Sequence, residues 1–138
     1  MEDCIFCKII NGEIPSNKIY ESENFVAFLD IMPINPGHTL IVSKKHYENM
    51  DELPEELGGE LLRVIKTVAR AIVKAVNADG YNIGMNNGRA AGQLVMHAHI
   101  HIIPRFSDDG LKSWPQERMD DSKLREIGEK IKKEIDKI

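Results

Sequence analysis

Hydrophobic residues recur along the chain at two spacings, and each spacing predicts one kind of element. Short apolar runs at 18–21, 24–30 and 39–43 are separated by segments rich in proline, glycine and asparagine, which is typical of strands joined by turns. Similar runs at 81–86 and 95–104 predict two further strands, separated by a short glycine-containing loop. The chain is therefore expected to hold about five short strands.

Two segments show the three- and four-residue spacing of an amphipathic helix. The first runs from 54 to 77, with Asp51 as its expected cap and Gly80 as its stop. The second follows Asp120 and ends among lysines, which suits the helix dipole. The apolar positions of the two stripes are Leu57, Leu61, Ile65, Val68, Ile72 and Val76, and then Leu124, Ile127, Ile131, Ile135 and Ile138. These elements predict an α+β fold, with a mostly antiparallel sheet, a long helix packed on it and a C-terminal helix.

The length of the chain sets its domain organisation. At 138 residues it is long enough to bury a core without disulfides, and it shows no internal repeat or low-complexity tract. We expect a single domain over 1–138, with a motif-bearing core at about 4–105 and a connector and helix at 106–138.

Charge and hydropathy exclude several classes of partner. The net charge is −4, from 18 Lys and Arg against 22 Asp and Glu, so binding to nucleic acid or to an anionic membrane is not expected. Residues 1–4 lack the features of a signal peptide, and no apolar stretch reaches the roughly 20 residues that span a bilayer. A cytoplasmic protein is expected, in which the two cysteines are reduced, metal-bound or buried.

The five histidines provide the candidate chemistry. Three of them, His97, His99 and His101, alternate along one predicted strand, and His38 and His46 adjoin earlier strand-like segments. Side chains at alternate positions of a strand share a face, about 7 Å apart step to step. The pattern predicts three imidazoles on one face and a core-facing row on the other, made of Met96, Ala98, Ile100 and Ile102. A merely half-buried polar face is less favoured, because a glycine-rich loop lies beside it.

Cys4 and Cys7 form a CxxC motif, and two cysteines with two histidines make a complete tetrahedral zinc set. The residues alone do not say which histidines take part. A thioredoxin-like redox pair shares the CxxC spacing, but no βαβ pattern follows it here. A third possibility places a catalytic metal, with an open coordination position, on the three alternating histidines themselves.

Taken together, these motifs resemble those of the histidine triad family of nucleotide hydrolases and transferases, over about 4–105. The resemblance is to small archaeal and bacterial members related to the histidine triad nucleotide-binding proteins. The motifs that carry it are Pro36-Gly37-His38, Lys45-His46, Asn86-Asn87-Gly88, Gly92-Gln93, and the alternating histidines followed by Ile102-Ile103-Pro104-Arg105.

The resemblance implies an enzyme that works through a nucleotidyl-histidine intermediate. His99 would attack the α-phosphorus of a nucleoside phosphoramidate, dinucleoside polyphosphate or similar substrate, and water would then release the nucleoside monophosphate. His38 and His101 would bind phosphate oxygens, and His97 is counted with this catalytic set. Imidazole suits the task because it is nucleophilic when neutral. No metal is needed for the chemical step, since imidazoles and loop amides can stabilise the charge.

The resemblance also implies a pocket for a purine nucleotide. Asp30 matches an acid that hydrogen-bonds the ribose, followed by Ile31. The remaining matches are Phe6, Ile9, Phe28 and Leu29 around the base, and Asn86, Gly92 and Gln93 in the phosphate loop. Considered without the resemblance, Asp30 could simply cap a turn, and the two phenylalanines could be core.

Three further expectations follow from the resemblance. The zinc ligands would be Cys4, Cys7, His46 and His97, in a closed structural site that pins the N-terminal segment to the histidine strand. The protein would be a homodimer. Leu94 stands where eukaryotic relatives carry a hydroxyl that touches phosphate, so a nucleotide-binding module with little or no turnover is the alternative to an enzyme.

Overall fold

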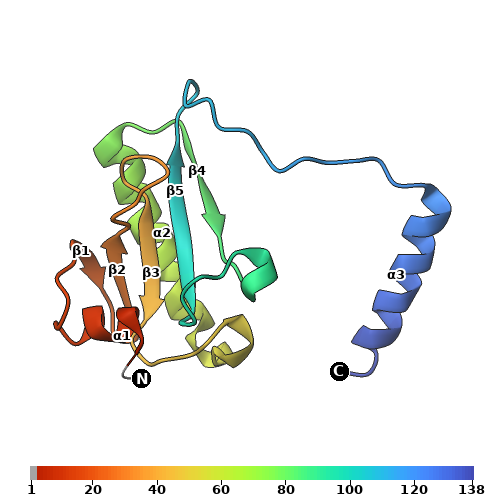
Figure 1. Ribbon diagram of the computed structural model, residues 1–138, viewed down its shortest axis with the longest axis horizontal. Coiled ribbons are helices and arrows are strands. Elements are labelled where there is room, and N and C mark those ends of the chain that lie inside the picture. The colour runs from red at the N-terminus through yellow and green to blue at the C-terminus, as the bar shows by residue number, and fades with distance from the viewer. Residues whose placement is uncertain (1–2) are drawn as a thin grey trace.

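The computed structural model describes residues 3–138 and shows a five-stranded sheet with helices on both faces (Figure 1). Its strands lie in the order β1-β2-β3-β5-β4, and every neighbouring pair is antiparallel. The α+β class and the antiparallel sheet predicted from the sequence are confirmed. The strands are β1 (Lys18–Glu21), β2 (Phe25–Leu29), β3 (Thr39–Ser43), β4 (Gly80–Gly84) and β5 (His99–Arg105).

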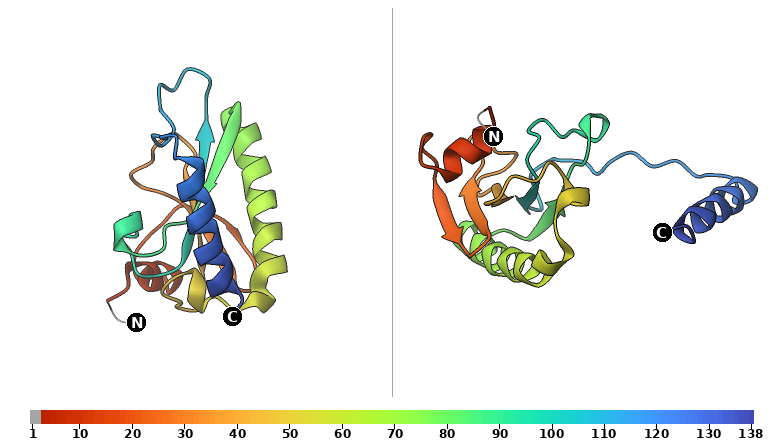
Figure 2. Two further views of the ribbon diagram at one scale, coloured as in Figure 1. Left: turned by 90° about the vertical axis from the view of Figure 1, so that its right-hand side faces the viewer. Right: turned by 90° about the horizontal axis from the view of Figure 1, so that it is seen from below.

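The long helix α2 (Gly58–Val76) covers one face of the sheet and buries the larger part of the core (Figure 2). Its apolar stripe meets the side chains that β2, β3 and β5 direct to that face, because alternate residues of a strand point the same way. The buried members of this cluster are Phe25, Ala27, Ile41, Val64, Val68, Ala69, Ile72, Ile100 and Ile102.

The start of α2 differs from the prediction. Two short 3-10 turns, η1 (Met50–Glu52) and η2 (Glu55–Leu57), precede the helix. Pro54 separates them in an extended conformation, with ψ of 137°, so the helical pattern that begins at 54 is interrupted before the helix forms. The expected cap, Asp51, is wrong: it lies inside η1, where its own N–H donates to the side chain of Asn49.

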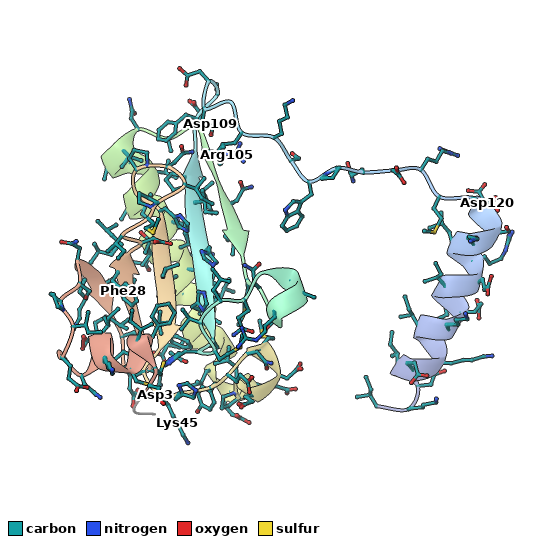
Figure 3. All side chains as sticks on the ribbon, in the orientation of Figure 1. Asp3, Phe28, Lys45, Arg105, Asp109 and Asp120 are labelled. Atoms are coloured by element: carbon teal, nitrogen blue, oxygen red, sulfur yellow. The ribbon has the colours of Figure 1, made fainter. Side chains whose placement is uncertain are left out.

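On the opposite face of the sheet lies a short helix, α1 (Ile5–Ile10), that the hydrophobic pattern did not predict. Phe6 from α1 packs with Val26 and Phe28 of β2 and with Leu40 and Val42 of β3. This second cluster brings the N-terminal segment against β2 and β3, and β3 neighbours the histidine-bearing strand β5 (Figure 3, where Phe28 is labelled).

The histidine strand begins later than predicted, since β5 starts at His99 and residues 95–97 form a bend. The N–H of Ala98 donates to the carbonyl of Tyr47 at 2.7 Å, and the imidazole of His97 bonds the carbonyl of Ser43 at 2.7 Å. These bonds hold the bend to the segment that follows β3 instead of to a regular ladder. The predicted single strand face with three imidazoles is therefore wrong: His97 precedes the strand, and Met96 is half-buried and lines a surface cavity instead of lying in the core.

After Arg105 the chain leaves the sheet as a connector and ends in helix α3 (Asp121–Ile135), which stands apart from the rest of the molecule (Figures 1 and 2). The predicted C-terminal helix is thus present, but none of its residues is buried. Among residues 3–138, no helix combines the length and apolarity needed to cross a bilayer.

Candidate functional site

Three histidines meet where β3 and β5 pair. His101 lies opposite Leu40, and His38 lies two residues before Leu40, so His38 and His101 come together on one face. His38 Nε2 is 3.0 Å from His101 Nδ1. The ring of His99 lies 5.0 Å from that of His101, centroid to centroid. His38 and His99 are buried, with exposed fractions of 3% and 7%.

Backbone hydrogen bonds determine which ring nitrogen of each imidazole carries the proton. The N–H of Ile34 donates to His38 Nδ1 at 3.1 Å, so the neutral ring of His38 carries its proton on Nε2. That Nε2–H then donates to His101 Nδ1. His101 in turn must carry its own proton on Nε2. Burial, with the neighbouring imidazoles, lowers the pKa of His101 to about 4, and burial also lowers the pKa of His38.

His99 has the opposite tautomer. Its Nδ1–H donates to the main-chain carbonyl of His97 at 2.7 Å, which leaves a lone pair on Nε2. Burial lowers the pKa of His99 as well, so its ring is neutral near pH 7. A neutral imidazole with a free, oriented lone pair has the properties of a nucleophile, and the adjacent His101 Nε2–H has those of a donor to an anion or a leaving group.

Asp30 lies at the edge of this cluster. One carboxylate oxygen accepts the N–H of Met32 at 2.9 Å, which is the turn-capping role that the residues alone allowed. The other oxygen lies 3.7 Å from His38 Nε2. Ile31, which follows, is 84% exposed, and its side chain is free to contact a ligand.

The residues expected around the base lie in and beside the second core cluster. The ring of Phe6 lies 5.7 Å from that of Phe28 and 5.0 Å from that of His99. Both phenylalanines are buried, Ile9 packs against them, and Leu29 is half-buried at the end of β2. The phenylalanines therefore also serve as core, and their cluster supports the imidazole of His99 from the α1 side.

The loop before the bend is held by the buried side chain of Gln93, which is 1% exposed. Its Oε1 accepts the N–H of Gly88 at 2.9 Å, and its Nε2 donates to the carbonyls of Glu48 and Val95. Gly92 has a φ of +94°, and Asn86 Nδ2 donates to its carbonyl at 3.3 Å. The amide of Gln93 thus orders the loop backbone, and the N–H groups of Ala91, Gly92 and Gln93 donate to carbonyls within the loop.

A second cluster joins the two cysteines to two histidines. His97 Nδ1 lies 3.2 Å from Cys4 Sγ and 3.6 Å from Cys7 Sγ, and His46 Nδ1 lies 3.4 Å from Cys7 Sγ. Tetrahedral zinc, with bonds of about 2.3 Å to sulfur and 2.0 Å to nitrogen, needs sulfur and nitrogen roughly 3.5 Å apart. The bond from His97 Nε2–H to the Ser43 carbonyl leaves the lone pair of Nδ1 facing the thiols. The donor set fits zinc.

Asp30, His38 and His101 form another group whose ligand atoms lie close together. His38 argues against a metal there, because its Nδ1 already accepts the N–H of Ile34 and its Nε2 must carry the ring proton. A metal on the three alternating histidines is equally disfavoured. The imidazole of His97 turns to the cysteines, so the three rings do not converge on one point.

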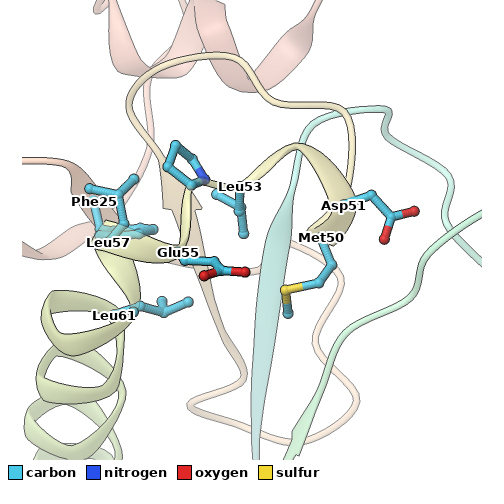
Figure 4. Close-up of a pocket in the computed structure, with 9 residues that line it drawn as sticks. Phe25, Met50, Asp51, Leu53, Glu55, Leu57 and Leu61 are labelled. Carbon is cyan, nitrogen blue, oxygen red and sulfur yellow. The ribbon is translucent and has the colours of Figure 1, made fainter. Parts of the chain in front are cut away.

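Two surface cavities accompany these clusters. One of about 420 Å³ is lined by Asp3, Cys4, Ile5, His46, Leu94, Val95 and Met96, next to the cysteines. Leu94 is 86% exposed. The other, of about 410 Å³, lies between η1, η2 and α2 and contains no histidine (Figure 4). Because the histidines and cysteines lie elsewhere, we do not take that second cavity as the site.

The sequence did not indicate the groups that orient the imidazoles. These groups are main-chain atoms of Ile34, Ser43 and His97. Their side chains vary in chemistry, so only the position of the backbone could have revealed them.

Comparison with known proteins assigns the family. The model of the HIT domain matches residues 11–108. An uncharacterized HIT-like protein of Methanocaldococcus jannaschii is 58% identical over 109 residues, which are 78% of this chain and 82% of that protein. An adenosine 5′-monophosphoramidase of Candida albicans is 41% identical over 98% of this chain and 93% of its own length. The chain belongs to the HIT family, as its motifs indicated.

Solved structures agree with this assignment. A crystal structure from Streptococcus mutans, 46% identical, superposes with a TM-score of 0.90 over 98% of this chain and 87% of that one. A zinc-bound histidine triad family protein from Mycobacterium smegmatis, 38% identical, superposes with a TM-score of 0.76 over 90% of this chain and 89% of that one. The fold is therefore that of the histidine triad proteins.

Proposed function

We propose that this protein hydrolyses or transfers nucleotides at the α-phosphate, through a covalent intermediate on His99. The observation that carries the proposal is the bond from His99 Nδ1–H to the carbonyl of His97, which leaves the Nε2 lone pair free. The adenosine 5′-monophosphoramidase of Candida albicans supports a nucleotide substrate. An adenosine phosphoramidate or a similar purine nucleotide is the substrate class we infer.

The reaction would proceed in two displacements. In the first, the Nε2 lone pair of His99 attacks the α-phosphorus, the bond from phosphorus to the leaving group breaks, and His101 Nε2–H supplies the proton that the leaving group needs. In the second, water attacks the phosphorus, the bond to His99 breaks, and the proton of the water returns to the imidazole pair. Each step has a lower barrier than direct hydrolysis, because a neutral imidazole is both a good nucleophile and a good leaving group.

The rest of the site would bind the nucleotide. Asp30 would hydrogen-bond the ribose through the oxygen that faces His38. Ile9, Leu29 and the exposed Ile31 would contact the base beside the phenylalanine cluster. The loop ordered by Gln93, with Asn86 and Gly92, would lie against the phosphate, because a glycine allows the backbone to approach an anion closely.

Zinc would be held by Cys4, Cys7, His46 and His97. When bound, it supplies a closed structural cross-link with no open coordination position for substrate. His97 would then act by position: its side chain is fixed in the cluster while its carbonyl orients His99. A metal content of one per chain that disappears when Cys4→Ser and Cys7→Ser are combined would place the ion here.

We also propose a homodimer and a cytoplasmic location, without nucleic-acid or membrane partners. Among the described strands, β4 lies at the edge of the sheet, and it exposes Tyr81 and Ile83 by 43% and 52%. An exposed apolar edge strand is a ready pairing surface. Leu62 of α2 is 58% exposed and adds to the apolar area of the body.

The test is intact mass spectrometry under non-acidic conditions, after a brief mix with an adenosine phosphoramidate. A transient adenylyl adduct that maps to His99, and is absent from His99→Ala, is the expected result. Turnover that survives in His99→Ala would overturn the covalent mechanism.

A nucleotide-binding module with little turnover is the second candidate, favoured by the exposed Leu94. It predicts adenosine monophosphate binding that is equal in the wild type and His99→Ala, with no adduct in either protein. Leu94→Ser separates the two candidates further, because a restored hydroxyl raises the rate only if the chemistry is already in place.

A further inference from the structure

The loop before β3, residues 31–38, carries the group that sets the tautomer of His38. That group is the N–H of Ile34, which donates to His38 Nδ1 at 3.1 Å. The loop contains no helix or strand, and its residues 31–34 and 36 are exposed. Exposed loops move more than the elements that they connect, and an exposed N–H can bond water instead of a ring nitrogen. The bond to His38 therefore requires that the loop be held in place.

The side chain of Asn35 holds the loop at the residue next to this N–H. Its Nδ2 donates to the carbonyl of Pro104 at 2.9 Å and to Asp109 Oδ2 at 3.1 Å. The carbonyl of Asn35 accepts the N–H of His38 at 3.0 Å. Because Pro104 belongs to β5, Asn35 ties the loop to the strand that carries His101.

Asp109 is a fixed acceptor for Asn35, because its carboxylate is bonded from several sides. Arg105 donates to it through Nε at 2.8 Å and through Nη2 at 3.1 Å (Figure 3). The N–H groups of Phe106 and Leu111 donate to it at 3.0 Å each. The Arg105 guanidinium holds the pKa of Asp109 well below its usual range, so this carboxyl is charged at neutral pH. Hydrogen bonds to a charged acceptor are the stronger kind.

The main chain of the loop is closed without the Asn35 side chain. The N–H of Asp30 donates to the carbonyl of His38 at 2.9 Å, which joins the two ends of the loop. Gly37 lies so close to α2 that a side chain there would meet it. The bonds of the Asn35 side chain are therefore not needed to form the loop. They fix its middle, where the N–H of Ile34 lies.

The tautomer of His38 decides which nitrogen of His101 carries a proton. With the N–H of Ile34 on its Nδ1, His38 donates from Nε2 to His101 Nδ1 at 3.0 Å, and His101 keeps its proton on Nε2. In the opposite arrangement, His101 Nδ1–H would donate to His38 Nε2, and His101 Nε2 would have no proton for a leaving group. Both arrangements contain one bond between the rings, so groups outside the pair choose between them. Asp30, at 3.7 Å from His38 Nε2, is too far to hydrogen-bond.

We propose that Asn35 and Asp109 are positioning residues, which fix the tautomers of His38 and His101 by holding the N–H of Ile34 against His38. Asn35 acts through the loop, and Asp109 acts through Asn35. The effect of this arrangement on the rate rests on the proposed function, in which His101 Nε2–H protonates the leaving group. The effect on the tautomers does not.

The first test is nitrogen-15 NMR of the histidine rings in the full chain. The wild type should show His38 with its proton on Nε2. Asn35→Ala removes both side-chain bonds and should shift the tautomer ratio of His38 about fivefold toward Nδ1–H, the effect of one lost hydrogen bond. His101 should change in the reciprocal sense. An unchanged ratio would overturn the proposal.

Asp79→Ala is the matched control on the same connector. Asp79 Oδ2 also takes part in two side-chain hydrogen bonds, from the N–H and the hydroxyl of Ser107 at 2.8 Å and 3.0 Å. These bonds do not involve the loop, so the tautomer ratios of His38 and His101 should stay as in the wild type. Equal shifts in Asp79→Ala and Asn35→Ala would indicate a general loosening and contradict the inference.

Asp109→Asn gives a second variant in case Asn35→Ala does not fold. It keeps the shape of the side chain but removes the charge and one acceptor oxygen. The tautomer ratio of His38 should shift in the same direction by a smaller factor, because the carbonyl of Pro104 still accepts from Asn35. A folded Asp109→Asn protein with the wild-type ratio would rule out the role of Asp109.

Turnover separates positioning from a merely structural role. In Asn35→Ala, kcat should fall by the same fraction as the population of His101 protonated on Nε2. In a His38→Asn background the same change should have no further effect, because Asn35 acts through His38. An equal loss of kcat in both backgrounds would overturn the inference. If the tautomers shift while kcat does not, the inference on the tautomers is supported and the proposed role of His101 in the reaction fails.

Discussion

The main-chain carbonyl of His97 accepts the Nδ1–H of His99 at 2.7 Å, while the imidazole of His97 lies 3.2 Å from Cys4 Sγ. A single residue therefore joins the cluster of cysteines and histidines to the candidate nucleophile. The side chain of His97 holds its own backbone in place, and that backbone fixes the tautomer of His99. Loss of this cluster should therefore disturb the orientation of the His99 imidazole, because the His97 carbonyl would no longer be held in place.

The variant Cys7→Ser tests that connection. We expect kcat to fall about 10–100-fold with KM little changed, because the nucleophile loses orientation while the nucleotide pocket stays intact. The melting temperature should fall at the same time, since the cross-link contributes to folding. Chelator-treated wild type should recover both properties when zinc is returned, whereas the variant should not. A normal kcat in a metal-free protein would contradict the connection.

The bond between His38 and His101 predicts a coupled effect on the rate. His38→Asn keeps an acceptor for the N–H of Ile34 but cannot reach His101, so the tautomer of His101 is no longer fixed. We expect kcat to fall by about 10²-fold, within the range of acid–base effects. In a His101→Asn background, the same change should have little further effect, because His38 acts through His101. Additive losses in this double-mutant cycle would mean that His38 acts independently.

Gly37 provides a test of packing beside the site. Its φ is +98°, and a Cβ there would lie 3.2 Å from Val76 Cγ1 and 3.3 Å from Ile72 Cγ2. We expect Gly37→Ala to lower the free energy of unfolding by about 2–4 kcal/mol, from backbone strain and crowding together. Gly12→Ala is the matched control, since Gly12 has a φ of +80° but open space around it. The Gly12→Ala variant should lower the free energy of unfolding only by the backbone strain, about 1 kcal/mol. If denaturant titrations show equal losses of unfolding free energy in the two variants, α2 must shift to accommodate the added methyl group at position 37.

Acid should destabilise the fold through His101. Burial lowers the pKa of this residue from 6.5 to about 4. Between pH 6.5 and pH 4, the imidazole of His101 therefore binds a proton in the unfolded chain but not in the folded protein. The stabilising contribution is complete above pH 6.5 and is lost as the pH falls toward 4. From pH 7 to pH 5 the loss should be about 1–2 kcal/mol, after allowance for partial exposure.

Denaturant midpoints at the two pH values, compared between wild type and His101→Gln, isolate this contribution. The variant should lose less stability on acidification, because it lacks the titrating ring and keeps the other acid-sensitive groups. An equal loss in both proteins would assign the acid sensitivity to other residues.

The sequence predicted the elements because the packing that stabilises them is periodic. The strands and both helices appear at their expected places, and the largest errors fall where local hydrogen bonds override the period. Pro54 interrupts the helical pattern, and the bonds of His97 and Ala98 turn a predicted strand into a bend. The short helix α1 was not predicted, because six residues are too few to show a helical stripe.

The residue types of the candidate site could also be predicted from the sequence, since a nucleophile, an acid and a set of metal ligands must each be particular side chains. By itself the sequence determined that histidines and cysteines would gather on an antiparallel sheet. Only the tertiary structure decided the tautomer of each ring, because the carbonyls of Ser43 and His97 and the N–H of Ile34 bond particular ring nitrogens. Backbone groups are common to all residues, so their effect depends on where folding places them and leaves no trace in the sequence.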